Sequence, residues 1–268
     1  MTNVVRHTAA KRAPMDSMRK TALVAGLLYL ITFISIPSLA LYKQVKTDPN
    51  FITSAGATTP LLVGGFLEII VALAGIGTAL ALFSVVKRQH EGFALGFVTT
   101  RVFEAGVIAV GVMSILSVVT LQQPGATGAE ATSLVTLGGG LVATYNWSFL
   151  LGQSLMPALN ALMIGTLMYR SGLVPRAIPA VGLIGAPLLI IATIATLFGV
   201  LEQYSAVPVL AAVPIGVWEL SLGLWLAIKG FKASAPLMIA AAARSGSSDG
   251  TATALPSRHV VATEAGAA

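Results

Sequence analysis

Residues 60–86 read PLLVGGFLEIIVALAGIGTALALFSVV, and this stretch decides the fold. It carries one charged side chain, Glu68, in a run longer than the roughly 20 apolar residues that a helix needs to cross a membrane. Lipid offers the backbone no hydrogen-bond partners, so such a run crosses as an α-helix, in which the backbone groups bond internally. The stretch therefore predicts a transmembrane helix.

The rest of the chain has the same character. Of its 268 residues, 56% are hydrophobic and 10% are charged, whereas about 25% are charged in a typical soluble domain. Five further runs have the length and composition of spans, at 21–42, 92–121, 143–169, 177–200 and 206–228. Because the alternation of a membrane β-barrel is missing, the runs predict an all-α fold, a polytopic membrane helix bundle with six transmembrane helices.

The basic residues predict an orientation. Thirteen of the 16 Lys and Arg residues lie in the two terminal segments and in the loops on the same side, and only Lys43 and Lys46 lie in the opposite loops. Lys and Arg are enriched on the cytoplasmic side of membrane proteins, so we expect both termini in the cytoplasm. Aromatic residues at the expected outer ends agree with an interfacial belt: Tyr42, Tyr145, Trp147 and Tyr204.

The same basic residues explain the net charge of +6. At the inner face they are placed to contact anionic lipid head groups. We therefore expect the lipid bilayer as the surroundings of the chain and no nucleic-acid partner.

The expected domain organisation has three parts. Residues 1–20 form a basic cytoplasmic tail, residues 21–232 the six-helix transmembrane domain, and residues 233–268 an Ala/Ser/Gly-rich cytoplasmic tail. Both tails have too few large apolar groups to offset chain entropy, which predicts disorder. Residues 128–142 turn weakly apolar and predict either a loop or an interfacial or re-entrant helix.

Four ionisable side chains fall inside the predicted spans: Glu68, Arg101, Glu104 and Glu219. A charge at the bilayer centre costs about 2.5–3.5 kcal/mol on insertion scales, so such residues pair with one another or mark functional sites. Arg101 and Glu104 are three residues apart and share a helix face. Glu219 lies at nearly the same depth, so we expect an Arg101–Glu104–Glu219 cluster.

Two interpretations of this intramembrane polar cluster are open at the level of the sequence. If all groups ionise, three carboxylates face one guanidinium, and a proton or a bound cation has to remove the surplus charge. Transporters use such groups. Alternatively, Arg101 ties the second, third and sixth helices together and the cluster only sets their packing.

The fourth span adds a stripe of amides. Asn146, Gln153 and Asn160 follow one another at intervals of seven residues, which places them on nearly one helix face. Together with Trp218, they are candidates for the lining of a polar cavity that leads to the carboxylates. The alternative is that they form hydrogen bonds between helices, worth about 0.6 kcal/mol each on average.

Catalytic motifs are missing from the sequence, among them G-x-S-x-G, H-E-x-x-H and the phosphate-binding loop. The chain has no cysteine, and its three histidines lie outside the predicted spans: His7, His90 and His259. We therefore expect a protein that is not an enzyme, with no catalytic residues, no metal site and no cofactor.

Several strings carry a resemblance to a known family. They include RVFEAG at 101–106, NWSFLLG at 146–152, LMYRSGLVPRAIPAVGLIGAPLL at 167–189 and WELSLGLWLAIKGF at 218–231. On these strings the chain resembles the bacterial integral-membrane family named domain of unknown function 4386, over roughly residues 20–232. The resemblance implies a multi-pass protein of the bacterial cytoplasmic (inner) membrane and assigns no activity.

Two functional classes follow. The first, and the main expectation, is a non-enzymatic membrane scaffold, sensor or assembly component, with a second copy or another membrane protein as its partner. The alternative is a small proton- or cation-linked transporter that uses the intramembrane carboxylates. In a scaffold, Glu219→Gln is expected to be nearly silent, whereas in a transporter it abolishes a flux.

Overall fold

The computed structural model describes residues 17–240, and within them all regular elements are helices. The tails expected to be disordered fall largely on residues 1–16 and 241–268, which lie outside the described part of the chain. The first residues of the expected C-terminal tail are ordered, because Ala235 is buried in the core and residues 236–240 are helical.

Six helices of the described chain are long and apolar enough to cross a membrane, as the composition predicted. They are α1 (Ser17–Ile31) with its extension to Leu41, α4 (Thr59–Val86), α5 (Glu91–Leu121), α6 (Gly128–Ser148) joined to α7 (Met156–Ser171), α8 (Ala177–Leu197) and α9 (Ala206–Ile228). The predicted all-α membrane bundle is therefore confirmed.

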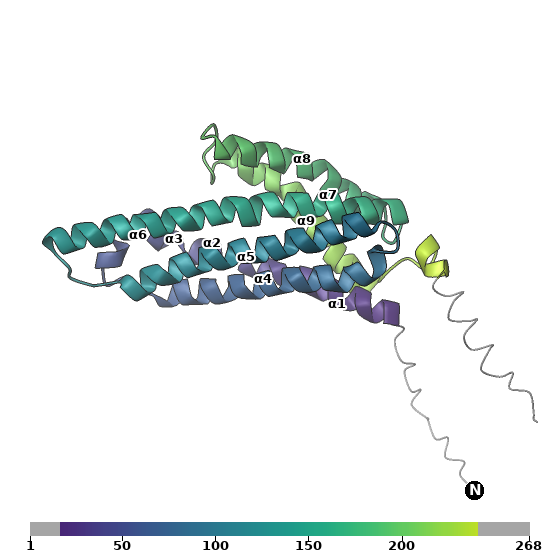
Figure 1. Cartoon of the computed structure of the whole chain (residues 1–268), viewed down its shortest axis with the longest axis horizontal. Coiled ribbons are helices and arrows are strands. Elements are labelled where there is room, and N and C mark those ends of the chain that lie inside the picture. Colours follow the sequence, from purple (N-terminus) through teal and green to yellow (C-terminus); the bar gives the residue numbers. More distant parts are fainter. Residues whose placement is uncertain (1–16, 241–268) are drawn as a thin grey trace, which may run out of the picture.

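The six spans form a closed ring. Each span packs against the spans that precede and follow it in the chain, and α9 packs against α1 to complete the circle. Figure 1 shows that the start of α1 and the end of α9 lie at the same end of the bundle, here termed the terminal end. The opposite end, termed the loop end, holds the connections 42–58 and 122–127, with α3 (Lys43–Thr47) and η2 (Phe51–Thr53).

Close packing and a clasp join the first span to the last. A Cβ on Gly26 of α1 would collide with the backbone of Ala227 in α9, and such small-residue contacts hold helices together in lipid. At the terminal end, Arg19 donates hydrogen bonds to the carbonyls of Leu226 at 2.9 Å, Ala227 at 2.7 Å and Ile228 at 3.1 Å. The guanidinium thus satisfies carbonyls that the end of α9 leaves without helical partners.

The first span is not one continuous helix. α1 ends at Ile31, the 3₁₀ turn η1 (Thr32–Ser35) follows, and the short helix α2 (Ser38–Leu41) begins after Pro37. The span predicted over 21–42 is therefore present but divided into three helical segments. Irregular backbone at membrane depth is tolerated only where it is buried in protein or lines a cavity.

The fourth span is longer than predicted. α6 continues through the π-helical segment η3 (Phe149–Leu155) into α7, so that Gly128–Ser171 forms one run of 44 residues. At 1.5 Å per residue this run is about 66 Å long, roughly twice the hydrocarbon thickness. Residues 128–142 therefore form neither an interfacial nor a re-entrant helix, but prolong the span beyond the other helices at the loop end (Figure 1).

Candidate functional site

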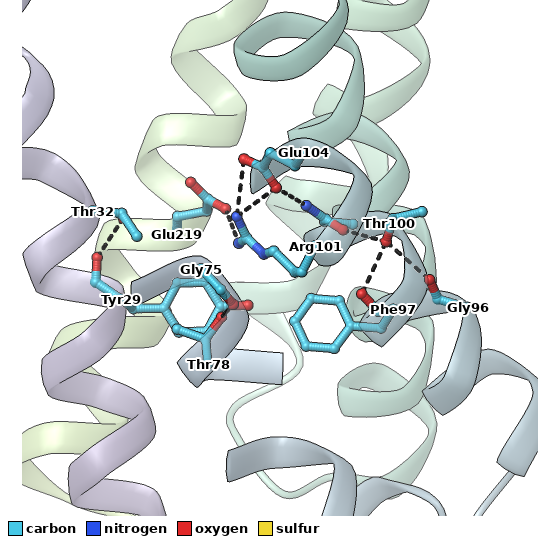
Figure 2. Close-up of polar contacts among 11 residues, drawn as sticks. Tyr29, Thr32, Gly75, Thr78, Gly96, Phe97, Thr100, Arg101, Glu104 and Glu219 are labelled. Atoms are coloured by element: carbon cyan, nitrogen blue, oxygen red, sulfur yellow. Dashed lines mark hydrogen bonds and ion pairs between the residues drawn. The ribbon is translucent and has the colours of Figure 1, made fainter. Parts of the chain in front are cut away.

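The interior of the ring holds Arg101, Glu104 and Glu219 together. Nη1 of Arg101 donates to both carboxylate oxygens of Glu104, at 3.0 and 3.2 Å, and Nη2 donates to Oε1 of Glu219 at 2.7 Å. Figure 2 shows the two carboxylates converging on the guanidinium. Glu104 belongs to the same helix as Arg101, whereas Glu219 comes from α9 on the opposite side of the ring. The ion pair therefore crosses the interior.

Aromatic rings complete the surroundings of the guanidinium. Arg101 is only 3% exposed. Its Cζ lies 5.5 Å from the ring centroid of Tyr29 in α1 and 5.7 Å from that of Phe97 in α5, within the range of cation–π attraction. Gly75 of α4 packs beside this side chain, since a Cβ there would lie in ordinary van der Waals contact, 3.7 Å from Cδ of Arg101. The second span therefore meets Arg101 by packing.

An amide from the fourth span joins the cluster. Asn160 of α7 donates from Nδ2 to Oε2 of Glu104 at 2.7 Å, and its Oδ1 accepts a hydrogen bond from Thr100. Glu104 is thus held both by Arg101 of its own helix and by Asn160 of a neighbouring one. This is the interhelical hydrogen bonding that the amide stripe offered as one of its two interpretations.

A cavity of about 250 Å³ lies beside these charges. Arg101 and Glu104 of α5, Glu219 of α9, Gln153 of η3 and Thr32 of η1 are among the side chains that line it. Because a water molecule takes up about 30 Å³ in the liquid, the cavity has room for several waters or one small solute. It is smaller than the pockets of about 300–1,000 Å³ that bind drug-sized ligands.

The helices are irregular around this cavity. η1 and the π-helical segment η3 both contribute lining residues, and Pro157, which also lines the cavity, follows η3. In α9, Pro214 immediately precedes the lining residue Ile215. A π-helical turn often marks a functional site, and each proline removes a backbone hydrogen bond. Irregular backbone thus surrounds the one group of paired charges in the described interior.

Glu68 does not join this cluster. It is 1% exposed, and its Oε1 accepts hydrogen bonds from Oη of Tyr145 at 2.8 Å and from Nε2 of Gln153 at 3.2 Å. Oη of Tyr42 lies 3.5 Å from its other oxygen, and Oγ of Ser38 lies 3.2 Å from Oε1. Neutral groups therefore surround Glu68. This set of residues is termed the Glu68 cage below.

The position of Glu68 changes the charge balance. The sequence suggested that Arg101 ties the second span to the third and sixth, but its ionic partners come only from α5 and α9. The cluster then holds two carboxylates and one guanidinium, a surplus of one negative charge if all are ionised. Within residues 17–240, no group of three or more His, Asp or Glu side chains is placed to hold a metal ion.

Two candidate cavity-lining residues lie elsewhere. Oδ1 of Asn146 accepts a hydrogen bond from Oη of Tyr204 at 3.2 Å at the loop end. The π-helical turns of η3 change the helical register between Asn146 and Gln153, so the two amides do not share one face. Trp218 is buried against Gly182 of α8, where a Cβ would collide with its ring. Consecutive residues of a helix point about 100° apart, and Trp218 is not among the residues that line the cavity, whereas Glu219 is.

A lysine lies at the loop end close to the Glu68 cage. Nζ of Lys46 donates to Oη of Tyr204 and lies 5.4 Å from the ring centroid of Tyr145. Burial lowers the pKa of Lys46 from 10.5 to about 8, and the charge of Glu68 opposes this effect only in part. The sequence marked Lys46 only as one of two outer lysines, and gave no sign of this contact.

The comparisons with known proteins assign no activity. A family model described as "Domain of unknown function (DUF4386)" matches residues 24–230, from within α1 to just past the end of α9. No curated protein and no solved structure matches the chain.

Proposed function

The chain belongs to the DUF4386 family, a domain of unknown function, and from the charged cluster in its interior we propose that it is a non-enzymatic carrier of a small cation or a proton. The single observation that supports this proposal is the surplus carboxylate beside the cavity. One unit of negative charge in a low-dielectric interior is removed by one proton or one monovalent cation. Each loading of the cavity would then carry one positive charge.

The size and lining of the cavity favour a small substrate. About 250 Å³ accommodates a monovalent cation with part of its water shell. Besides the carboxylates of Glu104 and Glu219, Thr32 and Ser35 line the cavity and offer oxygen atoms to a cation. The irregular segments η1 and η3 supply places where the lining can rearrange while the substrate is bound.

The surroundings proposed for this activity are those of the bacterial cytoplasmic membrane. The family resemblance and the excess of basic residues around the terminal end support an orientation in which that end faces the cytoplasm. The loop end then faces outward. Basic residues of the terminal end would contact anionic lipid head groups.

A second candidate is a scaffold, sensor or assembly component that pairs with a second copy or another membrane protein. The observation that favours it is the ion pair between Arg101 and Glu219, which joins opposite sides of the ring. In a scaffold this contact would only stabilise the bundle. Breaking a buried ion pair by removing one partner costs about 3–5 kcal/mol, so Arg101→Leu would lower the stability without changing any flux.

Ion flux into proteoliposomes distinguishes the two candidates. The full chain is reconstituted beside Glu219→Gln, and uptake is followed with a pH-sensitive dye and with a panel of monovalent cations. The matched control is Glu202→Gln, which removes an exposed carboxylate from the connection between α8 and α9. We expect flux in the wild type and the control, and a loss to the level of empty vesicles in Glu219→Gln.

The same experiment can overturn the proposal. Its interpretation requires that all three proteins show the same thermal unfolding in detergent, so that a loss of flux is not a loss of fold. Wild-type vesicles that conduct no better than empty ones would remove the carrier proposal. Equal flux in wild type and Glu219→Gln would remove the cavity as its site.

A further inference from the structure

The Glu68 cage holds a carboxyl group without a formal positive charge in hydrogen-bonding distance. Its neighbours are the hydroxyls of Ser38, Tyr42 and Tyr145 and the amide of Gln153. A buried charge is expensive unless it is well paired or hydrogen-bonded. If this group only stabilised the bundle, an apolar side chain would do so at a lower free-energy cost of burial. The carboxyl of Glu68 therefore points to a role other than packing.

The cage can accommodate both protonation states of Glu68. When Glu68 is ionised, Tyr145 at 2.8 Å and Gln153 at 3.2 Å donate hydrogen bonds to its Oε1. Ser38 has one hydroxyl hydrogen, and the carbonyl oxygen of Ser35 lies closer to Oγ, at 2.6 Å, than Glu68 does, at 3.2 Å. The Ser38 oxygen then presents a lone pair to Glu68, and a protonated carboxyl can donate to it.

The cage borders the cavity that Glu104 and Glu219 line. Gln153 donates to Glu68 and also lines the cavity together with Glu104 and Glu219. Ser35, whose carbonyl accepts from Ser38, is another lining residue. Gln153 therefore links the carboxyl of Glu68 to the space beside the charged cluster.

On its other side the cage reaches toward the loop end. The rings of Tyr42 and Tyr145 meet edge to face with centroids 5.1 Å apart. Lys46 of α3 lies over the Tyr145 ring and donates to the exposed Tyr204 of the α8–α9 connection. These four are the titratable groups that face Glu68 from the packed elements, and Lys46 is the charged one among them.

From this geometry we propose that Glu68 is a proton-exchange site that loads the cavity from the loop end. Because Glu68 is 1% exposed, a proton from the loop end has to pass the Tyr42–Tyr145 pair before it adds to an oxygen of ionised Glu68, and the carboxyl then donates to Ser38. The proton next leaves to water in the cavity and passes to the carboxylate of Glu104 or Glu219, so that Glu68 is ionised again. This inference rests on the proposed carrier function and assigns its outer proton entrance.

Proton uptake after an external pH jump tests the assignment in proteoliposomes of the full chain. Glu68→Gln keeps the shape of the side chain but cannot exchange a proton, and Tyr145→Phe removes the closest donor. The matched controls are Glu130→Gln at the start of α6 and Tyr169→Phe near the end of α7. We expect the rate to fall about a hundredfold in Glu68→Gln, as when a positioned acid–base group is removed, and to fall less in Tyr145→Phe. The two controls should match the wild type.

An infrared measurement keeps this inference separate from the proposed function. The protonated-carboxyl band that disappears in Glu68→Gln belongs to Glu68, and we expect it to rise and fall as the pH is varied over the range in which the protein stays folded. Wild-type vesicles without flux would overturn the carrier proposal, while a responsive band would still support Glu68 as an exchange site. A band that never changes, or wild-type uptake in a folded Glu68→Gln variant, would overturn the inference.

Discussion

One guanidinium in the middle of a lipid-embedded ring has to satisfy several requirements at once. Arg101 binds two carboxylates, lies against two aromatic rings and packs beside Gly75. Its Nε nevertheless has no hydrogen-bond partner. The side chain is therefore well paired in charge but not fully hydrogen-bonded.

The loop-end lysine gives a prediction on pH. Because burial lowers the pKa of Lys46 to about 8, the folded protein releases this proton near pH 8, whereas the unfolded chain keeps it up to about pH 10.4. In that window the unfolded state binds more protons, so the free energy of unfolding should rise with pH. We expect a gain on the order of 1 kcal/mol, since solvent screens this partly exposed amine.

Thermal unfolding in detergent between pH 7 and about pH 10 measures this contribution. Lys46→Met should show a flatter pH profile than the wild type, and Lys43→Met, which changes an exposed neighbouring lysine, should keep the wild-type slope. Identical profiles for Lys46→Met and the wild type would contradict the burial effect.

At the level of single residues, the sequence predicted some contacts and missed others. The grouping of Arg101, Glu104 and Glu219 follows from helix spacing and depth, which a sequence states directly. The partners of Glu68 could not be predicted in this way. Tyr42 and Tyr145 lie near span ends, where the expected role of tyrosine is an interfacial anchor. Both rings are instead buried, since α2 and α6 turn them toward α4.

Among the helices, the clasp between α1 and α9 leads to a second prediction. Arg19 makes three hydrogen bonds to the carbonyls at the end of α9, and hydrogen bonds to charged groups contribute about 1.5–3 kcal/mol each at most. We expect Arg19→Ala to lower the free energy of unfolding by about 2 kcal/mol, because water replaces part of the lost bonding.

Lys20→Ala is the matched control for this prediction, since Lys20 is the adjacent basic residue and is exposed. Thermal unfolding of both variants in the same detergent gives the comparison. If Arg19→Ala and Lys20→Ala unfold alike, the clasp does not stabilise the closure of the ring.

The regular helices followed from apolar run length, but their interruptions did not. Pro37 signals a break in the first span, yet the preceding Thr32–Ser35 turn has no comparable marker. The π-helical segment Phe149–Leu155 contains a glycine and two polar residues and precedes Pro157, which signals an irregularity but does not specify a π-helical turn. These two segments shape the cavity, so its lining could be predicted only in part.

For the whole molecule, the orientation is a testable prediction. A reporter fused after Ala268 should behave as cytoplasmic, because the basic residues cluster at the terminal end. The same reporter inserted within residues 122–127, the α5–α6 connection, should behave as external. A C-terminal fusion that reports the external side would contradict the orientation, and with it the assignment of the outer proton entrance.

The number of spans could be read from the sequence, whereas the closed ring could not. Run lengths count the helices, but which helix touches which depends on small residues at the contacts, such as Gly26 against α9. The sequence contains many glycines, 27 in all, and does not mark which of them lie between helices. Ring closure is what brings α5 and α9 to opposite sides of one interior.

The continuous run from α6 into α7 also has a mechanical consequence. The part from Gly128 to Ser148 is a stiff arm of about 30 Å that starts at the π-helical segment beside the cavity. If that segment acts as a fulcrum, a tilt of about 10° displaces the far tip of the arm by roughly 5 Å. A small shift around the carboxylates would thus become a larger displacement at the tip of α6, where a distance probe could follow it.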